Sequence, residues 1–241
     1  MPKKERHLER FGTTRGVGPS ASPRAEISDF VASVAKIAQP AGGRPGRLLF
    51  ALDATMSRQP TWDLACSLQA EMFEAIPKNA GLQVQLVYFR GIAECRASKW
   101  VADGAALARL MSGVTCRGGR TQISRVFAHA RAEHGRRKLN AVVYVGDALE
   151  ENVDLLAEKA GQLGLLGCPM FLFQEGRDPQ VEAAFREFAQ LSKGAYAKFD
   201  ANASTELASL LRAVAAFAAG GRDLLRLQKT HGAATILKQL S

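Results

Sequence analysis

Two patterns of apolar residues alternate along the chain between residues 48 and 219. Continuous apolar runs of about five residues are typical of strands buried on both faces, as in parallel sheets. Apolar residues at every third or fourth position are typical of amphipathic helices. The predicted strands are 48–52, 82–89, 139–145, 169–173 and 195–199, with a short edge strand near 96–100. The predicted helices are 62–76, 102–111, 122–134, 152–165, 180–191 and 204–219.

This alternation of strands and helices predicts an α/β fold. We expect a doubly wound, mostly parallel central sheet that carries helices on both faces, with one short antiparallel strand at its edge. The chain has 241 residues, which is enough for one such domain with additional terminal segments.

Residues 46–219 hold the predicted domain, and the segments on either side differ from it in composition. Residues 1–25 mix Lys, Arg, Gly, Ser and Pro with few apolar residues, which is typical of a flexible basic tail. Residues 26–45 predict a helix followed by a linker rich in Pro and Gly. Residues 220–241 contain two short Leu-rich pieces. We expect this extension to fold back onto the domain, and docking into a partner is the alternative.

Basic side chains outnumber acidic ones by 32 to 23, a net charge of +9, and the surplus lies in two segments. Residues 1–47 hold nine basic and four acidic side chains, and residues 112–138 hold seven and one. Clustered Lys and Arg permit nucleic-acid binding. Neither segment interleaves aromatic residues with its cations, so we expect solvated faces, or a field that steers an acidic protein partner.

The sequence also bounds the compartment. No run approaches the roughly 20 apolar residues that a membrane-spanning helix requires, and the charged N-terminus is not followed by an apolar run. The cysteines at 66, 95, 116 and 168 are far apart and form no Cys-x-x-Cys pair. We expect small, buried, reduced thiols and not a disulfide or a zinc site. The expectation is a cytoplasmic protein without a membrane span.

Oxygen-bearing side chains follow two of the predicted strands and one glycine turn. Asp53, Thr55 and Ser57 end the first strand, Thr121 ends the turn at 117–121, and Asp147 follows the strand at 139–145. In open α/β sheets, ligands bind outside the carboxyl ends of the strands, where the strand order reverses. Carboxylates, hydroxyls and water are oxygen ligands that suit Mg²⁺. These residues therefore predict a magnesium site at this edge of the sheet.

The order of these residues resembles the metal-ion-dependent adhesion site of von Willebrand factor type A (VWA) domains. That family carries an Asp-x-Ser-x-Ser motif after the first strand, a Thr in a glycine-rich loop and an Asp after the fourth strand. The matching residues are Asp53, Thr55, Ser57, Thr121 and Asp147. The match covers about residues 46–219 and suggests an intracellular, prokaryotic-type member of the family.

The resemblance implies a Mg²⁺-dependent protein-binding module and not an enzyme. In the family, an Asp or Glu carboxylate of a protein partner completes the coordination of the Mg²⁺ ion, and Mn²⁺ is the other ion expected to fit. The partner is expected to belong to an intracellular complex, in some members one that contains an ATPase. Two positions depart from the family pattern. Thr55 replaces the usual Ser and keeps the hydroxyl, and Ala148 stands where Gly is frequent.

Simpler roles compete with metal binding at each position. Asp53 and Asp147 also suit helix capping, and hydroxyls often bond to nearby backbone. A Mg²⁺-dependent phosphatase of the haloacid dehalogenase type is the best enzyme alternative, but such enzymes carry Asp where this chain has Thr55, so we expect no catalysis. We expect the adjacent Glu150 and Glu151 to form a solvated helix start, and His134 to be a packed helix-end residue.

Overall fold

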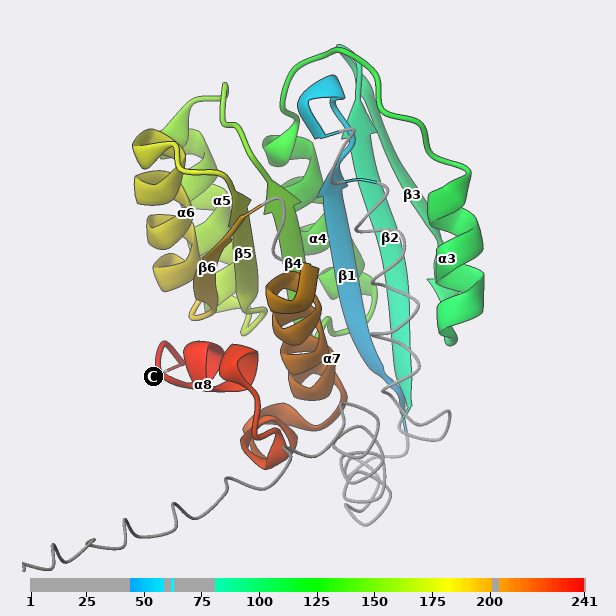
Figure 1. The fold of residues 1–241 in the computed structure, drawn as a ribbon, viewed down its shortest axis with the longest axis vertical. Helices are drawn as coiled ribbons and strands as arrows, with labels where there is room; N and C mark the ends of the chain where they lie inside the picture. Colours follow the sequence, from blue (N-terminus) through cyan, green and yellow to red (C-terminus); the bar gives the residue numbers. More distant parts are fainter. Residues whose placement is uncertain (1–43, 59–61, 63–80, 201–203, 241) are drawn as a thin grey trace, which may run out of the picture.

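The computed structural model describes residues 44–58, 62, 81–200 and 204–240 (Figure 1). The predicted tail at 1–25, the predicted helix at 26–39 and all but one residue of the predicted helix at 62–76 lie outside these ranges. Trp62 belongs to that predicted helix, is 2% exposed, and packs in the core.

The centre of the molecule is a six-stranded sheet in the order β3-β2-β1-β4-β5-β6. Its strands are β1 (Gly46–Asp53), β2 (Leu82–Arg90), β3 (Glu94–Val101), β4 (Ala141–Gly146), β5 (Met170–Glu175) and β6 (Ala195–Phe199). All neighbours pair in parallel except β3, which runs antiparallel to β2 at the edge. The predicted fold class and its antiparallel edge strand are confirmed.

Helices cover both faces of this sheet (Figure 1). One face carries α4 (Ile123–Arg136), α5 (Val153–Leu165) and α6 (Pro179–Leu191). The other carries α3 (Gly104–Ser112), α7 (Ser204–Leu227) and α8 (His231–Leu237), and a short 3-10 turn, η1 (Met56–Arg58), follows β1. Side chains that alternate along β1 divide between the two layers, Leu48, Phe50 and Leu52 toward α7 and Leu49 and Ala51 toward α4. This explains why the whole of β1 is buried.

A polar cluster that the sequence did not predict lies at the amino end of β1. Arg47 is 5% exposed, and its Nη2 lies 2.6 Å from Oε2 of Glu133 on α4. Trp100 Nε1 donates to the same carboxylate at 3.2 Å, and the Arg47 guanidinium stacks 3.7 Å from the centre of the Trp100 ring. Arg136 Nη1 lies 2.5 Å from Glu133 Oε1. The cluster joins β1, the edge strand β3 and the end of α4.

The C-terminal segment packs on the α7 side of the sheet. The backbone leaves helical geometry at Gly220 and Gly221, and Gly221 has a φ of 69°, in the left-handed region that favours glycine. The kink turns the rest of the segment toward the domain, where its apolar side chains join the core. These side chains are Leu224, Leu225, Ala233, Ile236 and Leu240. The segment therefore folds back, as the first of the two sequence interpretations expected.

Candidate metal centre

The crevice that the sheet order predicts as a binding site lies between β1 and β4. From β1 the chain goes to β2 and β3 on one side, and β4, β5 and β6 lie on the other, so the order reverses between these two strands. Leu52 pairs with Val145, which places Asp53 opposite Gly146 and Asp147 one residue further along. Adjacent strands lie about 4.8 Å apart. The two predicted carboxylates therefore follow neighbouring strands at the same edge of the sheet.

The first loop turns its side chains back toward the end of β1. Asp53 is fully buried, and its Oδ1 accepts a hydrogen bond of 2.8 Å from the amide of Thr55. Thr55 is 8% exposed, and its Oγ1 lies 3.2 Å from Oγ of Ser57. The loop thus gathers one carboxylate and two hydroxyls within five consecutive residues.

Backbone hydrogen bonds hold the glycine turn against this loop. The amide of Arg117 donates to the carbonyl of Ala54 at 3.1 Å, and the amide of Arg120 donates to the carbonyl of Gly91 at 3.1 Å. A Cβ atom at Gly119 would lie 2.1 Å from the carbonyl oxygen of Gly91, whereas one at Gly118 would meet no atom within 4 Å. Gly119 is therefore required for the close approach of the turn to the β2–β3 hairpin, and Gly118 is not.

Thr121 joins the glycine turn to the loop that carries Asp147. The Thr121 amide donates to Oε2 of Glu150 at 3.0 Å, and the Glu150 amide donates to the Thr121 hydroxyl at 3.0 Å. Thr121 is 6% exposed. The reciprocal pair fixes the Thr121 hydroxyl against the 147–151 loop, and an oxygen that accepts one hydrogen bond keeps a second lone pair.

Glu151 has a role that the sequence interpretation assigned wrongly. Its carboxylate accepts hydrogen bonds from the amides of Ile123 and Ser124, the latter at 2.9 Å, so it caps the start of α4. Burial raises the pKa of the Glu151 carboxyl, against the opposite effect of these amides. The cap of α5 is instead Asn152, which accepts from Leu155. The acidic pair therefore holds the Thr121 region and does not form a solvated helix start.

Asp147 follows Gly146, a position with little space. A Cβ atom at Gly146 would lie 2.6 Å from the hydroxyl of Tyr144, whose ring packs between Phe89 and Phe185. Asp147 Oδ1 is buried and has no hydrogen-bond partner among the described residues. A buried carboxylate oxygen without a partner is costly, and a bound cation would compensate it.

The oxygen atoms gathered here suit a hard cation such as Mg²⁺. Two carboxylates and three hydroxyls come from three loops that contact one another, and oxygen is the ligand atom that Mg²⁺ prefers. Within residues 44–58, 62, 81–200 and 204–240, no group of three or more His, Cys, Asp and Glu side chains is placed to hold a metal ion. The candidate ligands are instead two carboxylates and three hydroxyls, and hydroxyls are not among the groups counted in such a cluster.

Comparison with known proteins identifies the fold. No protein-family model matches the chain, and no curated protein matches it in sequence. Among solved structures, the VWA domain of SpRpn10 matches with a TM-score of 0.55 at 11% identity, over 68% of this chain and 94% of that one. The vWF domain of the type V pili tip protein Mfa5 from Porphyromonas gingivalis matches with 0.56 at 10% identity, over 74% and 95%. This chain has a VWA fold.

Exposed basic and apolar side chains lie on the loops that carry the five residues or contact those loops. Arg117 and Arg120 are exposed, and neither makes an ion pair among the described residues. Met56 is 56% exposed and Ile92 is 84% exposed. The Arg58 side chain, which also flanks the motif in sequence, lies outside what the structure describes. These loops therefore expose two cations and two apolar side chains, together with the carboxylate of Glu150 beside Thr121.

Two further groups complete the account of candidate chemistry. His134 accepts from the amide of Leu139 at 3.3 Å, and burial lowers its pKa, which confirms a packed helix-end residue. Cys116 and Cys168 are buried and Cys95 is half-buried, whereas Cys66 lies outside the described residues. Burial raises the pKa of Cys168 to about 12, so this thiol is inert at neutral pH. No helix in the described part of the chain is long and apolar enough to span a bilayer.

Proposed function

We propose that the protein is a non-catalytic, Mg²⁺-dependent protein-binding module. The observation that carries the proposal is the convergence of Asp53 and Asp147 at the carboxyl ends of β1 and β4, with hydroxyls of Thr55, Ser57 and Thr121 on the contacting loops. The VWA fold of the chain supports it, since SpaC from Lactobacillus rhamnosus GG, a pilus adhesin, matches with a TM-score of 0.59 at 10% identity, over 75% of this chain and 31% of that one.

Each residue has a definite task in this proposal. Asp53 and Asp147 supply negative charge, and Thr55, Ser57 and Thr121 supply neutral oxygens. A bound Mg²⁺ would supply an open coordination position for an acidic ligand. Arg117 and Arg120 on the exposed rim favour the same ligand by charge. The partner that fits is therefore a protein presenting an Asp or Glu carboxylate.

The setting of this interaction belongs to the same proposal. The free thiols at Cys95 and Cys168 suit a reducing compartment such as the cytoplasm. We place the module there as an adaptor or a subunit of a complex. The resemblance to VWA domains suggests a complex that contains an ATPase. Mn²⁺ is expected to replace Mg²⁺.

The proposal is tested by affinity capture of partners with the full chain, in Mg²⁺ and in EDTA. Partners are expected to be retained in Mg²⁺, released by EDTA, and absent with Asp53→Asn or Asp147→Asn. Asp154→Asn is the matched control, because it removes one exposed carboxylate from the first turn of α5 and leaves the five residues intact. Identical partners in all conditions would exclude a metal-dependent mechanism, and phosphate-ester turnover that requires Asp53 would establish the enzyme alternative.

A further inference from the structure

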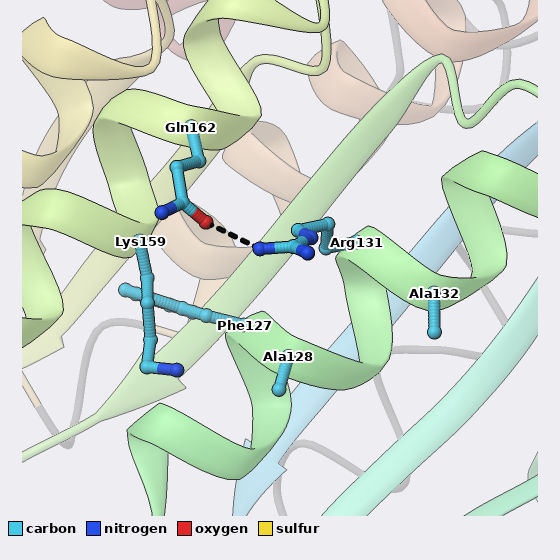
Figure 2. A pocket seen from close by; sticks show the side chains of 6 residues that line it. All are labelled: Phe127, Ala128, Arg131, Ala132, Lys159 and Gln162. Carbon is cyan, nitrogen blue, oxygen red and sulfur yellow. Dashed lines mark hydrogen bonds between the residues drawn. The ribbon is translucent and has the colours of Figure 1, made fainter.

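A second surface of the molecule lies between the outer sides of α4 and α5, away from the candidate metal centre. A hollow of about 360 Å³ opens there, lined by Phe127, Ala128, Arg131, Ala132, Lys159 and Gln162 (Figure 2). We propose that this α4–α5 groove binds an acidic amphipathic helix of a partner protein.

The floor of the groove is apolar, and its exposed positions on α4 carry only small side chains. Ala128 and Ala132 lie one turn apart on α4 and are exposed, and the buried Phe127 closes the bottom. A position with only a methyl group on an exposed helix surface allows another helix to approach closely. The hollow therefore has room for apolar side chains from an incoming element.

The walls of the groove are positively charged. Arg131 projects from α4 and Lys159 from α5, and neither makes an ion pair within the described part of the chain (Figure 2). Arg131 Nη1 donates to Gln162 Oε1 at 2.7 Å, and Gln162 Nε2 donates to Glu158 Oε1 at 3.0 Å. Gln162 thus holds the Arg131 guanidinium over the groove, while the carboxylate of Glu158 accepts from a neutral amide and makes no ion pair with Arg131 or Lys159 among the described residues. Two cations without acidic partners attract carboxylates.

Two exposed leucines lie beyond the groove lining, Leu155 in the first turn of α5 and Leu166 at its C-cap. Leu155 is 59% exposed and Leu166 is 48% exposed. Their spacing from Lys159 and Gln162 is four, three and four residues, so all four side chains share one face of α5. The stretch from Leu155 to Leu166 is about 16 Å, the length of about three helical turns. This face has an apolar side chain at each end and Lys159 and Gln162 between them, which matches a helix with apolar residues on one side and acidic residues beside them.

Charge argues against the two occupants that the chain itself offers. Residues 1–47 hold nine basic and four acidic side chains, so the N-terminal segment carries the same sign as the groove walls. A second copy would bring an identical basic face, and like charges repel across a symmetric contact. A partner of opposite charge remains.

The proposal is tested with a synthetic helical peptide of about 14 residues, about four turns, that carries leucines at spacings of three and four and glutamates on both flanks. Fluorescence anisotropy with the full chain is expected to show saturable binding in Mg²⁺ and equally in EDTA. A peptide with glutamine in place of each glutamate is expected to bind about tenfold more weakly. The double variant Arg131→Glu/Lys159→Glu should lose binding to a similar degree, and Ala132→Trp should block the groove while keeping its charge.

The matched control is Arg109→Glu, which reverses an exposed cation on α3, over the opposite face of the sheet. Binding unchanged by this control supports a specific groove. Equal loss with the control, or equal binding of the glutamine peptide, would overturn the proposal in favour of non-specific charge. A photocrosslinker at Ala132 that reacts with residues 1–43, or with a second copy, would overturn it in favour of those occupants. Because the peptide assay does not need the metal, its failure leaves the proposed function untouched.

Discussion

Two adjacent glycines in the turn beside the candidate metal centre face different surroundings. Gly119 lies against the backbone of Gly91, where an added Cβ would meet three atoms closer than 3 Å, and Gly118 faces open space. Gly119→Ala is therefore expected to push the turn away from the β2–β3 hairpin and to destabilise the fold by about 1–3 kcal/mol. Urea unfolding measures this free energy.

Gly118→Ala is the matched control, because it adds the same methyl group one residue earlier. The structure predicts almost no change in stability for it. The displaced turn in Gly119→Ala carries Thr121, so its metal affinity should fall as well. Equal stability of the two variants would mean that the turn is not held against the hairpin.

The carboxylates of the candidate centre should link stability to metal concentration. An ion that binds only the folded state adds RT ln(1 + [L]/Kd), about 2.7 kcal/mol at 100 times the Kd. We expect the melting temperature of the natural sequence and of Asp154→Asn to rise as the concentration of Mg²⁺ or Mn²⁺ increases. Asp147→Asn should abolish the rise, because it removes a ligand whose Oδ1 has no protein partner among the described residues.

The same experiment tests whether these residues have only a structural role. If they merely capped and turned the backbone, the melting curves of the natural sequence would not respond to either ion up to several times cellular levels. In EDTA, Asp147→Asn should melt at nearly the same temperature as the natural sequence, because an amide side chain can keep the local backbone contacts.

At the scale of elements, the buried cluster around Glu133 fastens the edge strand and α4 to β1. Glu133→Ala would leave Arg47 buried without a counter-charge, and removing one partner of a buried pair typically costs about 3–5 kcal/mol. The double variant Glu133→Leu/Arg47→Met should recover much of that loss, because no charge is then left unpaired. Urea unfolding of the single and double variants measures both values.

The dependence on pH gives this prediction a second readout. Burial alone raises the pKa of the Glu133 carboxyl, but hydrogen bonds from Arg47, Arg136 and Trp100 outweigh it and lower the pKa. A carboxyl with a lowered folded-state pKa contributes stability above its unfolded pKa of about 4.3 and loses it as pH falls through the folded value. The difference in the free energy of unfolding between the natural sequence and Glu133→Ala should therefore become smaller below about pH 4. Asp223→Ala, which breaks an exposed pair with Arg226, should have little effect on stability at any pH.

The elements themselves were largely predictable, and their long-range polar contacts were not. The continuous apolar runs located all five parallel strands within about two residues, because full burial on both faces demands that pattern. The edge strand was expected near 96–100 and extends over Glu94–Val101. The Arg47–Glu133 pair joins positions 86 residues apart. The local sequence pattern does not predict such a pair, because the two residues meet only when α4 packs on β1.

The candidate site also has a part that the sequence predicted and a part that it did not. Asp53 and Asp147 were expected just past the ends of two strands, and they lie there, because an Asp at the end of an apolar strand is visible in the sequence; that these two strands are neighbours comes from the structure. The cap that Glu151 forms on α4 was missed, since it depends on which helix start lies beside the 147–151 loop. That neighbour is fixed by the strand order, which the pattern of apolar residues does not specify. The metal itself stays a prediction.

At the scale of the whole molecule, the candidate metal centre and the buried polar cluster lie at opposite ends of the sheet. Asp53 and Asp147 of the candidate metal centre lie at the carboxyl ends of β1 and β4, and the Arg47 cluster lies at the amino end of β1. The C-terminal segment packs on the α7 side and also closes the sheet edge. Gln239 donates to the carbonyl of Tyr196 and accepts from its amide, both at 2.8 Å, so one side chain satisfies backbone groups of the free edge of β6.

This separation predicts that damage to the C-terminal segment lowers stability without altering metal binding. Ile236 is fully buried in the core on α8, and Ile236→Ala should lower the free energy of unfolding by about 2–5 kcal/mol and the melting temperature by about 5–15 °C. The exposed Lys238 two residues later offers the matched control, Lys238→Ala, which should melt like the natural sequence. The midpoint Mn²⁺ concentration in a titration below the melting transition should be the same for all three proteins. An unchanged melting temperature for Ile236→Ala would favour the interpretation that this segment docks into a partner. A higher midpoint Mn²⁺ concentration in a folded variant would show that the C-terminal segment and the metal centre are coupled.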